Sequence, residues 1–190
     1  MPKIENMLQT MKDQGIPEEI ITKFILPKTK KPKPEEILAF VTQMDVLLSK
    51  EQCISIMDKQ GCNKTNQYSA PFRKFGEKYK DKTLEERVAL WHEIDTPHKV
   101  TCILNDDKTI TLKFKFGDKG NWHCPCSPIK KLKPATFPLT HCGCCGAHIR
   151  YTHEFALGVK LRLKKIVSSM ANSDGEKPCE FVYEIEGFAE

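Results

Sequence analysis

The chain has 190 residues, of which 39% are hydrophobic and 29% are charged, as in an ordinary water-soluble globular protein. No stretch approaches the roughly 18 uninterrupted apolar residues that a membrane-spanning helix needs, and the first residues contain no apolar signal core. We therefore expect a cytoplasmic protein with no membrane partner. The net charge of +5 is a mild excess, which does not favour nucleic acid as a partner.

The first half of the chain has the apolar periodicity of helices. The repeat predicts helices over residues 4–11, 17–26, 34–48 and 50–60. The lysine-rich link at residues 28–33 has no aromatic residue to stack on a base, so we interpret it as a solvated linker.

Two more helices are expected before the first strand. Ser69 with Pro71 begins one of them, and Thr83 with Glu86 has the spacing of a capping box at the start of the other. These segments complete a helical region over residues 1–96.

The remaining region, residues 97–190, is rich in cysteine and has the alternation of strands. Val100–Leu104 and residues 109–116 flank a polar turn, which predicts a hairpin with one buried face. A helix is expected over residues 142–157, and a second hairpin closes the chain. The sequence thus predicts an α+β fold in one compact domain, with amino-terminal helices followed by a small antiparallel sheet of two hairpins around a cysteine-rich helix.

Five of the nine cysteines lie in two short segments on either side of a fifteen-residue gap. The segments read His123-Cys124-Pro125-Cys126 and His141-Cys142-Gly143-Cys144-Cys145-Gly146-Ala147-His148. Thiols and imidazoles this close together are the ligands of zinc and of iron–sulfur clusters. Because the reducing cytosol disfavours disulfides, metal binding or thiol chemistry is the favoured interpretation.

Helical spacing places several of these side chains on one face. Cys142 and Cys145 are three residues apart, as are Cys145 and His148, while Cys144 and His148 are four apart. The first turn of a helix is also expected to lower the pKa of a thiol through the helix dipole.

These patterns predict a metal site. The principal ligands are expected to be Cys124, Cys126, Cys142 and Cys145. Further candidates are Cys62, Cys144 and His148. Zinc is the default metal for mixed sulfur and nitrogen ligands. More than four soft ligands are present, so a redox or thiol enzyme with an iron–sulfur cluster or a reactive cysteine stays open as an alternative.

The cysteines assigned to apolar packing are Cys53, Cys102 and Cys179.

Several segments together carry a family resemblance. They are residues 141–151, 156–161, 167–169 and 178–181, with Gly61-Cys62 and Cys124-Pro125-Cys126. On these segments the chain resembles a family of uncharacterised cysteine-rich proteins of anaerobic bacteria. The resemblance implies a bacterial cysteine-rich protein and no defined activity.

Two local resemblances suggest further hypotheses. Gly175, Cys179 and Phe181 are similar to the closing hairpin of 4-vinyl reductase-type domains, which implies a sensor module holding a small hydrophobic molecule between helices and sheet. Cys124-Pro125-Cys126 resembles one ligand unit of the catalytic subunit of ferredoxin–thioredoxin reductase, which implies iron–sulfur chemistry. The second unit of that subunit would correspond to Cys142-Gly143-Cys144, which departs from the Cys-Pro-Cys pattern because it lacks the proline.

Overall fold

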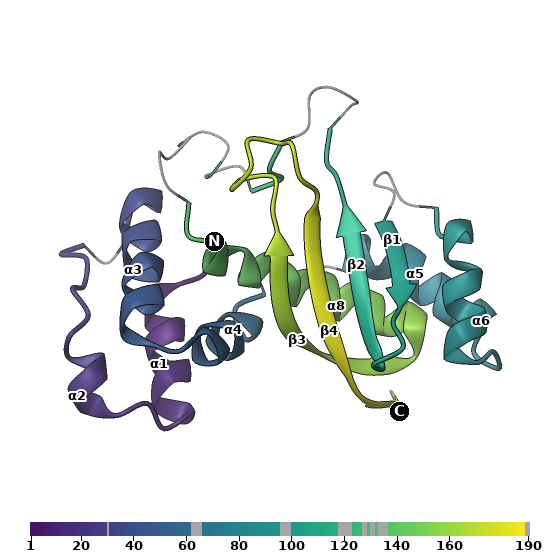
Figure 1. Cartoon of the computed structure of the whole chain (residues 1–190), viewed down its shortest axis with the longest axis horizontal. Coiled ribbons are helices and arrows are strands. Elements are labelled where there is room, and N and C mark those ends of the chain that lie inside the picture. Colours follow the sequence, from purple (N-terminus) through teal and green to yellow (C-terminus); the bar gives the residue numbers. More distant parts are fainter. Residues whose placement is uncertain are drawn as a thin grey trace.

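The computed structural model describes residues 1–29, 31–61, 66–95, 100–117, 123–126, 129, 132 and 137–188, with the backbone alone at 66–68. The architecture is α+β, as the sequence predicts. Helices come first, and a long helix then packs across a four-stranded antiparallel sheet (Figure 1). None of the helices within these ranges is long and apolar enough to cross a membrane.

Four helices form the amino-terminal part of the molecule. They are α1 (Ile4–Asp13), α2 (Glu18–Ile21), α3 (Pro34–Leu47) and α4 (Lys50–Asp58). Their apolar faces meet in one core whose fully buried side chains include Met7, Phe40 and Met44. The predicted first, third and fourth helices are therefore confirmed, because the 3.6-residue repeat matches the buried face.

The predicted second helix is correct in its start and wrong in its length. α2 follows Pro17 and ends at Ile21, five residues earlier than expected. Beyond it, the backbone N–H of Ile25 donates to Gln43 Oε1 at 2.7 Å, and the Ile25 carbonyl accepts from Gln43 Nε2 at 3.2 Å. The Gln43 amide thus satisfies backbone groups that a longer helix would have paired internally.

A second group of helices lies at the opposite end of the molecule (Figure 1). It consists of α5 (Asn66–Lys78), α6 (Leu84–Ala89) and a single 3-10 turn (Trp91–Glu93). The predicted capping box of α6 is confirmed. Thr83 Oγ1 accepts from the backbone N–H of Glu86 at 3.3 Å, and the Thr83 N–H donates to Glu86 Oε2 at 2.8 Å.

The sheet joins the two predicted hairpins into one surface. Its strands are β1 (Val100–Leu104), β2 (Thr109–Phe114), β3 (Val159–Ser168) and β4 (Cys179–Phe188), in the order β1-β2-β4-β3. All pairs are antiparallel, and the two hairpins meet where β2 pairs with β4. One face is apolar and buried, and its fully buried side chains include Ile110, Leu112, Phe181 and Tyr183.

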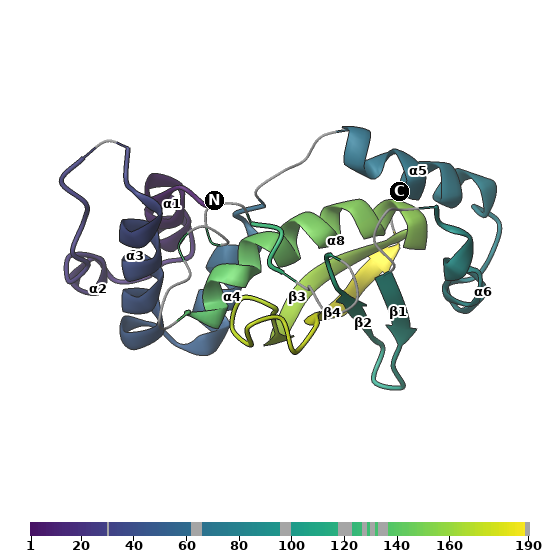
Figure 2. The same cartoon turned by 90° about the horizontal axis from the view of Figure 1, so that it is seen from above.

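Helix α8 (Gly143–Leu157) covers this buried face, and α5 packs against α8 (Figure 2). Gly146 allows the close approach, since a Cβ there would lie 3.1 Å from side-chain atoms of Leu163 and Phe181. The helix ends at Gly158, whose φ of 70° is the left-handed conformation that glycine adopts at low cost.

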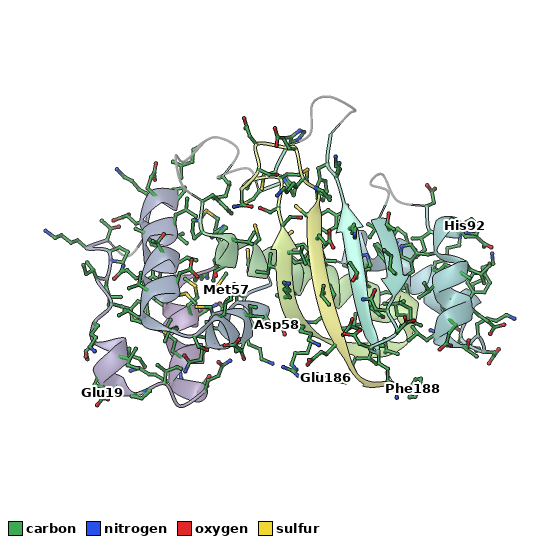
Figure 3. The ribbon with its side chains drawn as sticks, in the orientation of Figure 1. Glu19, Met57, Asp58, His92, Glu186 and Phe188 are labelled. Atoms are coloured by element: carbon green, nitrogen blue, oxygen red, sulfur yellow. The ribbon has the colours of Figure 1, made fainter. Side chains whose placement is uncertain are left out.

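The start of α8 stands between two apolar cores. Cys142 belongs to the core between the sheet and α8, whereas Cys144 belongs to the core of the amino-terminal helices. A Cβ at Gly143 would lie only 2.5 Å from Met57 Cβ of α4. Met57 and Asp58 mark this junction in Figure 3. The first turn of α8 therefore contacts both halves of the fold.

Candidate functional site

Three chain segments converge at one end of the sheet. The end of β2 and the turn between β3 and β4 lie at the same end (Figure 1), because Cys179 at the start of β4 pairs with Phe114 at the end of β2. The chain then leads from Phe116 toward the Cys124 segment, and the N–H of His123 donates to the Phe116 carbonyl at 3.1 Å. The segment that contains Cys124 and Cys126 thus begins close to the end of the sheet where Cys179 lies.

The thiol of Cys142 is the centre of this group. Burial is the main cause that raises its pKa, and the charges of the Cys179, Cys124 and Cys126 thiols raise it further. Cys124 in turn interacts with Cys126 and Cys179. Four cysteines from three segments therefore lie within electrostatic range of one another, and three of them are predicted metal ligands.

Hydrogen-bond donors surround these sulfur atoms. The Ser169 side chain bonds to the sulfur of Cys142, and the backbone of Met170 bonds to that of Cys179. The backbone of Cys126 bonds to the sulfur of Cys124. Backbone and hydroxyl donors of this kind orient thiolates and stabilise their negative charge.

Burial nevertheless keeps the thiols of Cys124, Cys142 and Cys179 protonated at neutral pH. Burial raises the pKa of Cys124 to about 12 and that of Cys179 to about 11, against the pull of the hydrogen bonds. Burial also raises the pKa of Cys142, although this residue stands at the amino-terminal end of α8. The expected lowering by the helix dipole is wrong here, because desolvation of a fully buried thiolate outweighs the dipole.

The structure describes three of the four remaining predicted ligands. Cys145 packs against the same core as Cys142. Cys144 points into the amino-terminal core. His148 lies one turn further along α8 than Cys145. Cys62 is not among the described residues.

The described part of the chain contains no group of three or more His, Cys, Asp or Glu side chains placed so that they could hold a metal ion as they stand. The four cysteines are thus within electrostatic range of one another but do not form a set of metal ligands as described.

Sequence reasoning missed the position of Cys179. It was assigned to packing, and its side chain is indeed 4% exposed and part of the sheet core. The signal that could have found it is topological. Cys179 follows the last turn directly, and Cys124 follows the strand that pairs with it, so both belong at the same end of the sheet.

A second unusual feature is His153 on α8, which is 1% exposed. Its Nδ1 lies 2.8 Å from the Ile149 carbonyl and 2.9 Å from Thr152 Oγ1. Its ring stacks on Trp91 with centroids 5.3 Å apart and lies 4.5 Å from the Phe72 ring. No described residue provides a hydrogen-bond partner for its Nε2 atom.

His153 is neutral in this setting. Burial lowers its pKa to about 3. With Nδ1 donating its proton to the Ile149 carbonyl, Nε2 carries a lone pair that faces the protein interior. In a metal-bound histidine, one ring nitrogen typically donates its proton to the protein and the other binds the metal. A histidine that accepts a hydrogen bond from a ligand uses its two nitrogens in the same way.

Comparisons with known proteins give little guidance. No family model matches the chain, and no curated protein matches it. Among solved structures, an H-NOX protein from S. oneidensis in the Fe(II)NO ligation state superposes with a TM-score of 0.33 at 10% identity, over 95% of this chain and 98% of that one. An H-NOX domain from Shewanella oneidensis in the Fe(II)CO state gives 0.32 at 10% identity, over 98% and 99%. At these TM-scores the likeness assigns neither a ligand nor an activity to this chain.

Proposed function

We propose that the chain is a metal-binding protein whose site is formed by the thiolates of Cys124, Cys126, Cys142 and Cys179. The pairing of β2 with β4 supports the proposal, because it places Cys179 at the strand end from which the chain leads to Cys124. The electrostatic effect of the other three thiols on Cys142 is consistent with this arrangement. Four thiolates are a complete ligand set for a tetrahedral structural zinc ion. Zinc is therefore the proposed metal.

Binding requires two changes from the described arrangement. The thiols must lose their protons, and a divalent cation favours this because its charge stabilises the buried thiolates. The sulfur atoms must also turn toward a common centre. Rotation about χ1 of cysteine moves the sulfur between staggered wells and needs no change of the backbone.

The ion would act as a structural clamp. It would join the segment after β2, the start of α8 and the start of β4. Since the first turn of α8 also contacts α4, the amino-terminal helices would be held in place through the same ion. Binding free energy gained at such a site contributes to folding.

Elemental analysis of protein purified without oxygen tests this proposal. We expect about one zinc ion per chain. Cys142→Ser and Cys179→Ser should each lose the zinc. The matched controls are Cys144→Ser, which changes a thiol of the same first turn that belongs to the other core, and Cys145→Ser, which changes a thiol packed against the sheet core. Both should retain the metal.

The outcomes distinguish the competing ligand sets. Metal-free wild-type protein would contradict the proposal. Loss of zinc from Cys145→Ser with retention in Cys179→Ser would replace this ligand set by the one expected from helical spacing. Iron with broad visible absorption would favour the redox alternative with an iron–sulfur cluster.

One observation favours a second candidate function, a sensor that binds a small molecule. The buried Nε2 atom of His153 offers an acceptor between aromatic rings, and an acceptor left unpaired in such a place costs roughly 1–3 kcal/mol. A small aromatic molecule with one hydroxyl donor would satisfy it. Phenol is a suitable probe, since Trp91 stacks on His153 and reports binding by its fluorescence.

The chain has two tryptophans, Trp91 and Trp122. The titration is best made in a Trp122→Phe background, so that all tryptophan fluorescence comes from Trp91. Saturable quenching by phenol that His153→Phe abolishes would support the sensor. Quenching that is linear in phenol concentration, or that is equal in His153→Phe, would eliminate it.

A further inference from the structure

The positive charge of this chain is concentrated in one short segment. Residues 22–34 contain five lysines and no acidic residue. The whole chain has 30 basic and 25 acidic residues, so the remainder is balanced at 25 of each. The net charge of +5 is thus a local property of this segment.

The segment lies at the edge of the molecule. It runs between α2 and α3, at the end furthest from α6 (Figures 1 and 2). Glu19 on α2 marks this end in Figure 3. Among the described residues, no ion pair involves Lys23, Lys28, Lys31 or Lys33. The nearest acids in sequence are Glu35 and Glu36, and Glu36 is bonded to the backbone N–H of Lys33.

Large aliphatic side chains project from the same place. Ile25 is 79% exposed and Leu26 is 51% exposed. Their exposure is imposed by the fold, because Gln43 of α3 holds the backbone of Ile25 by two hydrogen bonds. Val46, three residues beyond Gln43 on the same helix face, is 78% exposed. Among the described residues, these are three of the six large hydrophobic side chains that are exposed.

The composition of this surface indicates its partner. It combines lysines with aliphatic side chains and contains neither an arginine nor an exposed aromatic ring. Protein interfaces are enriched in aromatic residues and arginine and depleted in lysine, and single-stranded nucleic acids need aromatic rings for stacking. Lysines beside projecting aliphatic side chains suit an anionic membrane surface, where the charges meet lipid headgroups and the apolar side chains enter the interface.

We propose that residues 22–29 and 31–34, together with Val46, form a docking surface for an anionic lipid bilayer. We call it the lysine surface. The protein would lie on the membrane by this end, with Ile25 and Leu26 at the level of the headgroups. The proposal concerns adsorption and needs no spanning helix. It would replace two expectations from the sequence, that the protein has no membrane partner and that residues 28–33 are only a solvated linker. It is also independent of the metal site, which lies at the end of the sheet.

Co-sedimentation with vesicles tests the lysine surface in the full chain. The probes are vesicles of phosphatidylcholine alone and of equimolar phosphatidylcholine and phosphatidylglycerol. We expect binding to the second kind alone, weakened by added salt. Because each lysine near an anionic surface contributes about a fivefold change in affinity, Lys28→Gln/Lys31→Gln should bind roughly 25-fold more weakly.

Two further variants separate charge from apolar contact. Lys160→Gln/Lys165→Gln removes the same charge from exposed positions on β3 and should bind like the wild type. Ile25→Asn/Leu26→Asn keeps the charge and should bind several-fold more weakly. Each variant is first checked for an unchanged circular dichroism spectrum.

Three results would overturn the proposal. The first is equal partition onto neutral and anionic vesicles. The second is an equal loss of binding in the β3 control, which would indicate general charge attraction. The third is full binding by Ile25→Asn/Leu26→Asn together with complete competition by soluble polyglutamate or oligonucleotide, which would assign the surface to an acidic macromolecule.

Discussion

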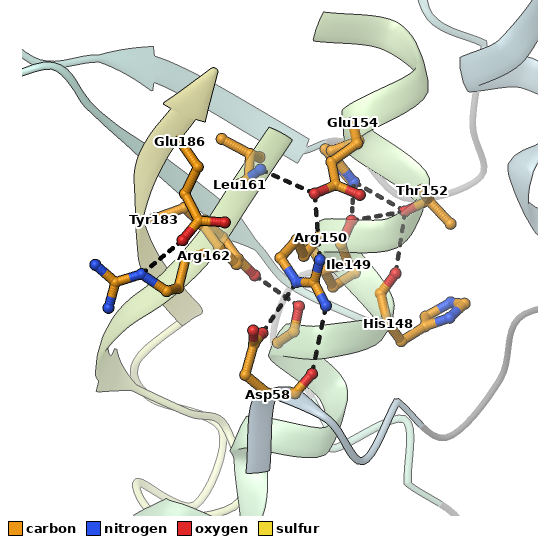
Figure 4. A network of polar contacts seen from close by, with 12 residues as sticks. Asp58, His148, Ile149, Arg150, Thr152, Glu154, Leu161, Arg162, Tyr183 and Glu186 are labelled. Atoms are coloured by element: carbon orange, nitrogen blue, oxygen red, sulfur yellow. Dashed lines mark hydrogen bonds and ion pairs between the residues drawn. The ribbon is translucent and has the colours of Figure 1, made fainter. Parts of the chain in front are cut away.

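Arg150 Nε of α8 lies 3.0 Å from Asp58 Oδ1 at the end of α4, and the two side chains are only 19% and 7% exposed. The same guanidinium contacts Glu154 Oε1 at 3.2 Å, and that oxygen accepts the backbone N–H of Leu161 at 2.8 Å (Figure 4). This network connects α4 to α8 and, through Leu161, to the beginning of β3. Burial raises the pKa of Asp58, and Arg150 acts in the opposite direction.

Removal of Arg150 should therefore leave a buried carboxylate without its counter-ion. We expect Arg150→Met to lower the free energy of unfolding by about 3 kcal/mol. Arg162→Met is the matched control, because Arg162 on the open face of the sheet pairs with Glu186 (Figure 4). It also pairs with Glu184. That change should cost no more than about 1 kcal/mol in urea denaturation.

A double variant distinguishes the ion pair from simple packing. Asp58→Asn/Arg150→Met no longer contains the unpaired carboxylate, so part of the stability lost in Arg150→Met should return. If Arg150→Met is no less stable than Arg162→Met, the network does not hold α4 against α8.

Gly76 is the point at which α5 touches α8. A Cβ at this position would lie 2.0 Å from the backbone oxygen of Phe155, a distance that no side-chain rotation can relieve. Gly76→Ala should lower the free energy of unfolding by at least about 2 kcal/mol, although alanine is the better helix former by about 1 kcal/mol. Lys74→Ala, an exposed change on the same helix, should shift the urea midpoint hardly at all. A more stable Gly76→Ala protein would show that the helices are further apart.

Arg87 is buried and donates to three backbone carbonyls. Its side chain bonds to Lys80 at 2.7 Å, to Lys82 at 3.2 Å and to Ala156 near the end of α8 at 3.3 Å. Lysine carries the same charge but cannot reproduce the planar fork of donors. Arg87→Lys should therefore cost about 2 kcal/mol, measured by thermal unfolding. A variant with unchanged melting temperature would mean that solvent replaces these hydrogen bonds.

The outline of this fold is readable from the sequence because its signals are local. Strand alternation at Ile110 and Leu112 and the capping box of Thr83 each depend on residues a few positions apart. The length of α2 could not be read, because Gln43, which lies eighteen residues beyond Ile25, satisfies the backbone there. The placement of Cys179 and Cys124 at one end of the sheet likewise depends on the pairing of β2 with β4, which no local pattern specifies.

His153 should make the protein sensitive to acid. Burial lowers its pKa from 6.5 to about 3, so the unfolded chain takes up a proton at a higher pH than the folded one. The stabilisation that this histidine provides is complete above pH 6.5 and is lost as the pH falls toward 3. The loss should reach roughly 2–3 kcal/mol at about pH 4.5.

The variant His153→Phe isolates this effect, because phenylalanine fits among Phe72 and Trp91 without a titrating group. Its free energy of unfolding, measured by urea denaturation between neutral and acidic pH, should fall less steeply than that of the wild type. The difference between the two proteins should open progressively below pH 6.5 and remain constant above it. Parallel curves would mean that the imidazole reaches solvent or a partner that stabilises its charged form, and Nε2 would then not be the buried acceptor that the sensor hypothesis requires.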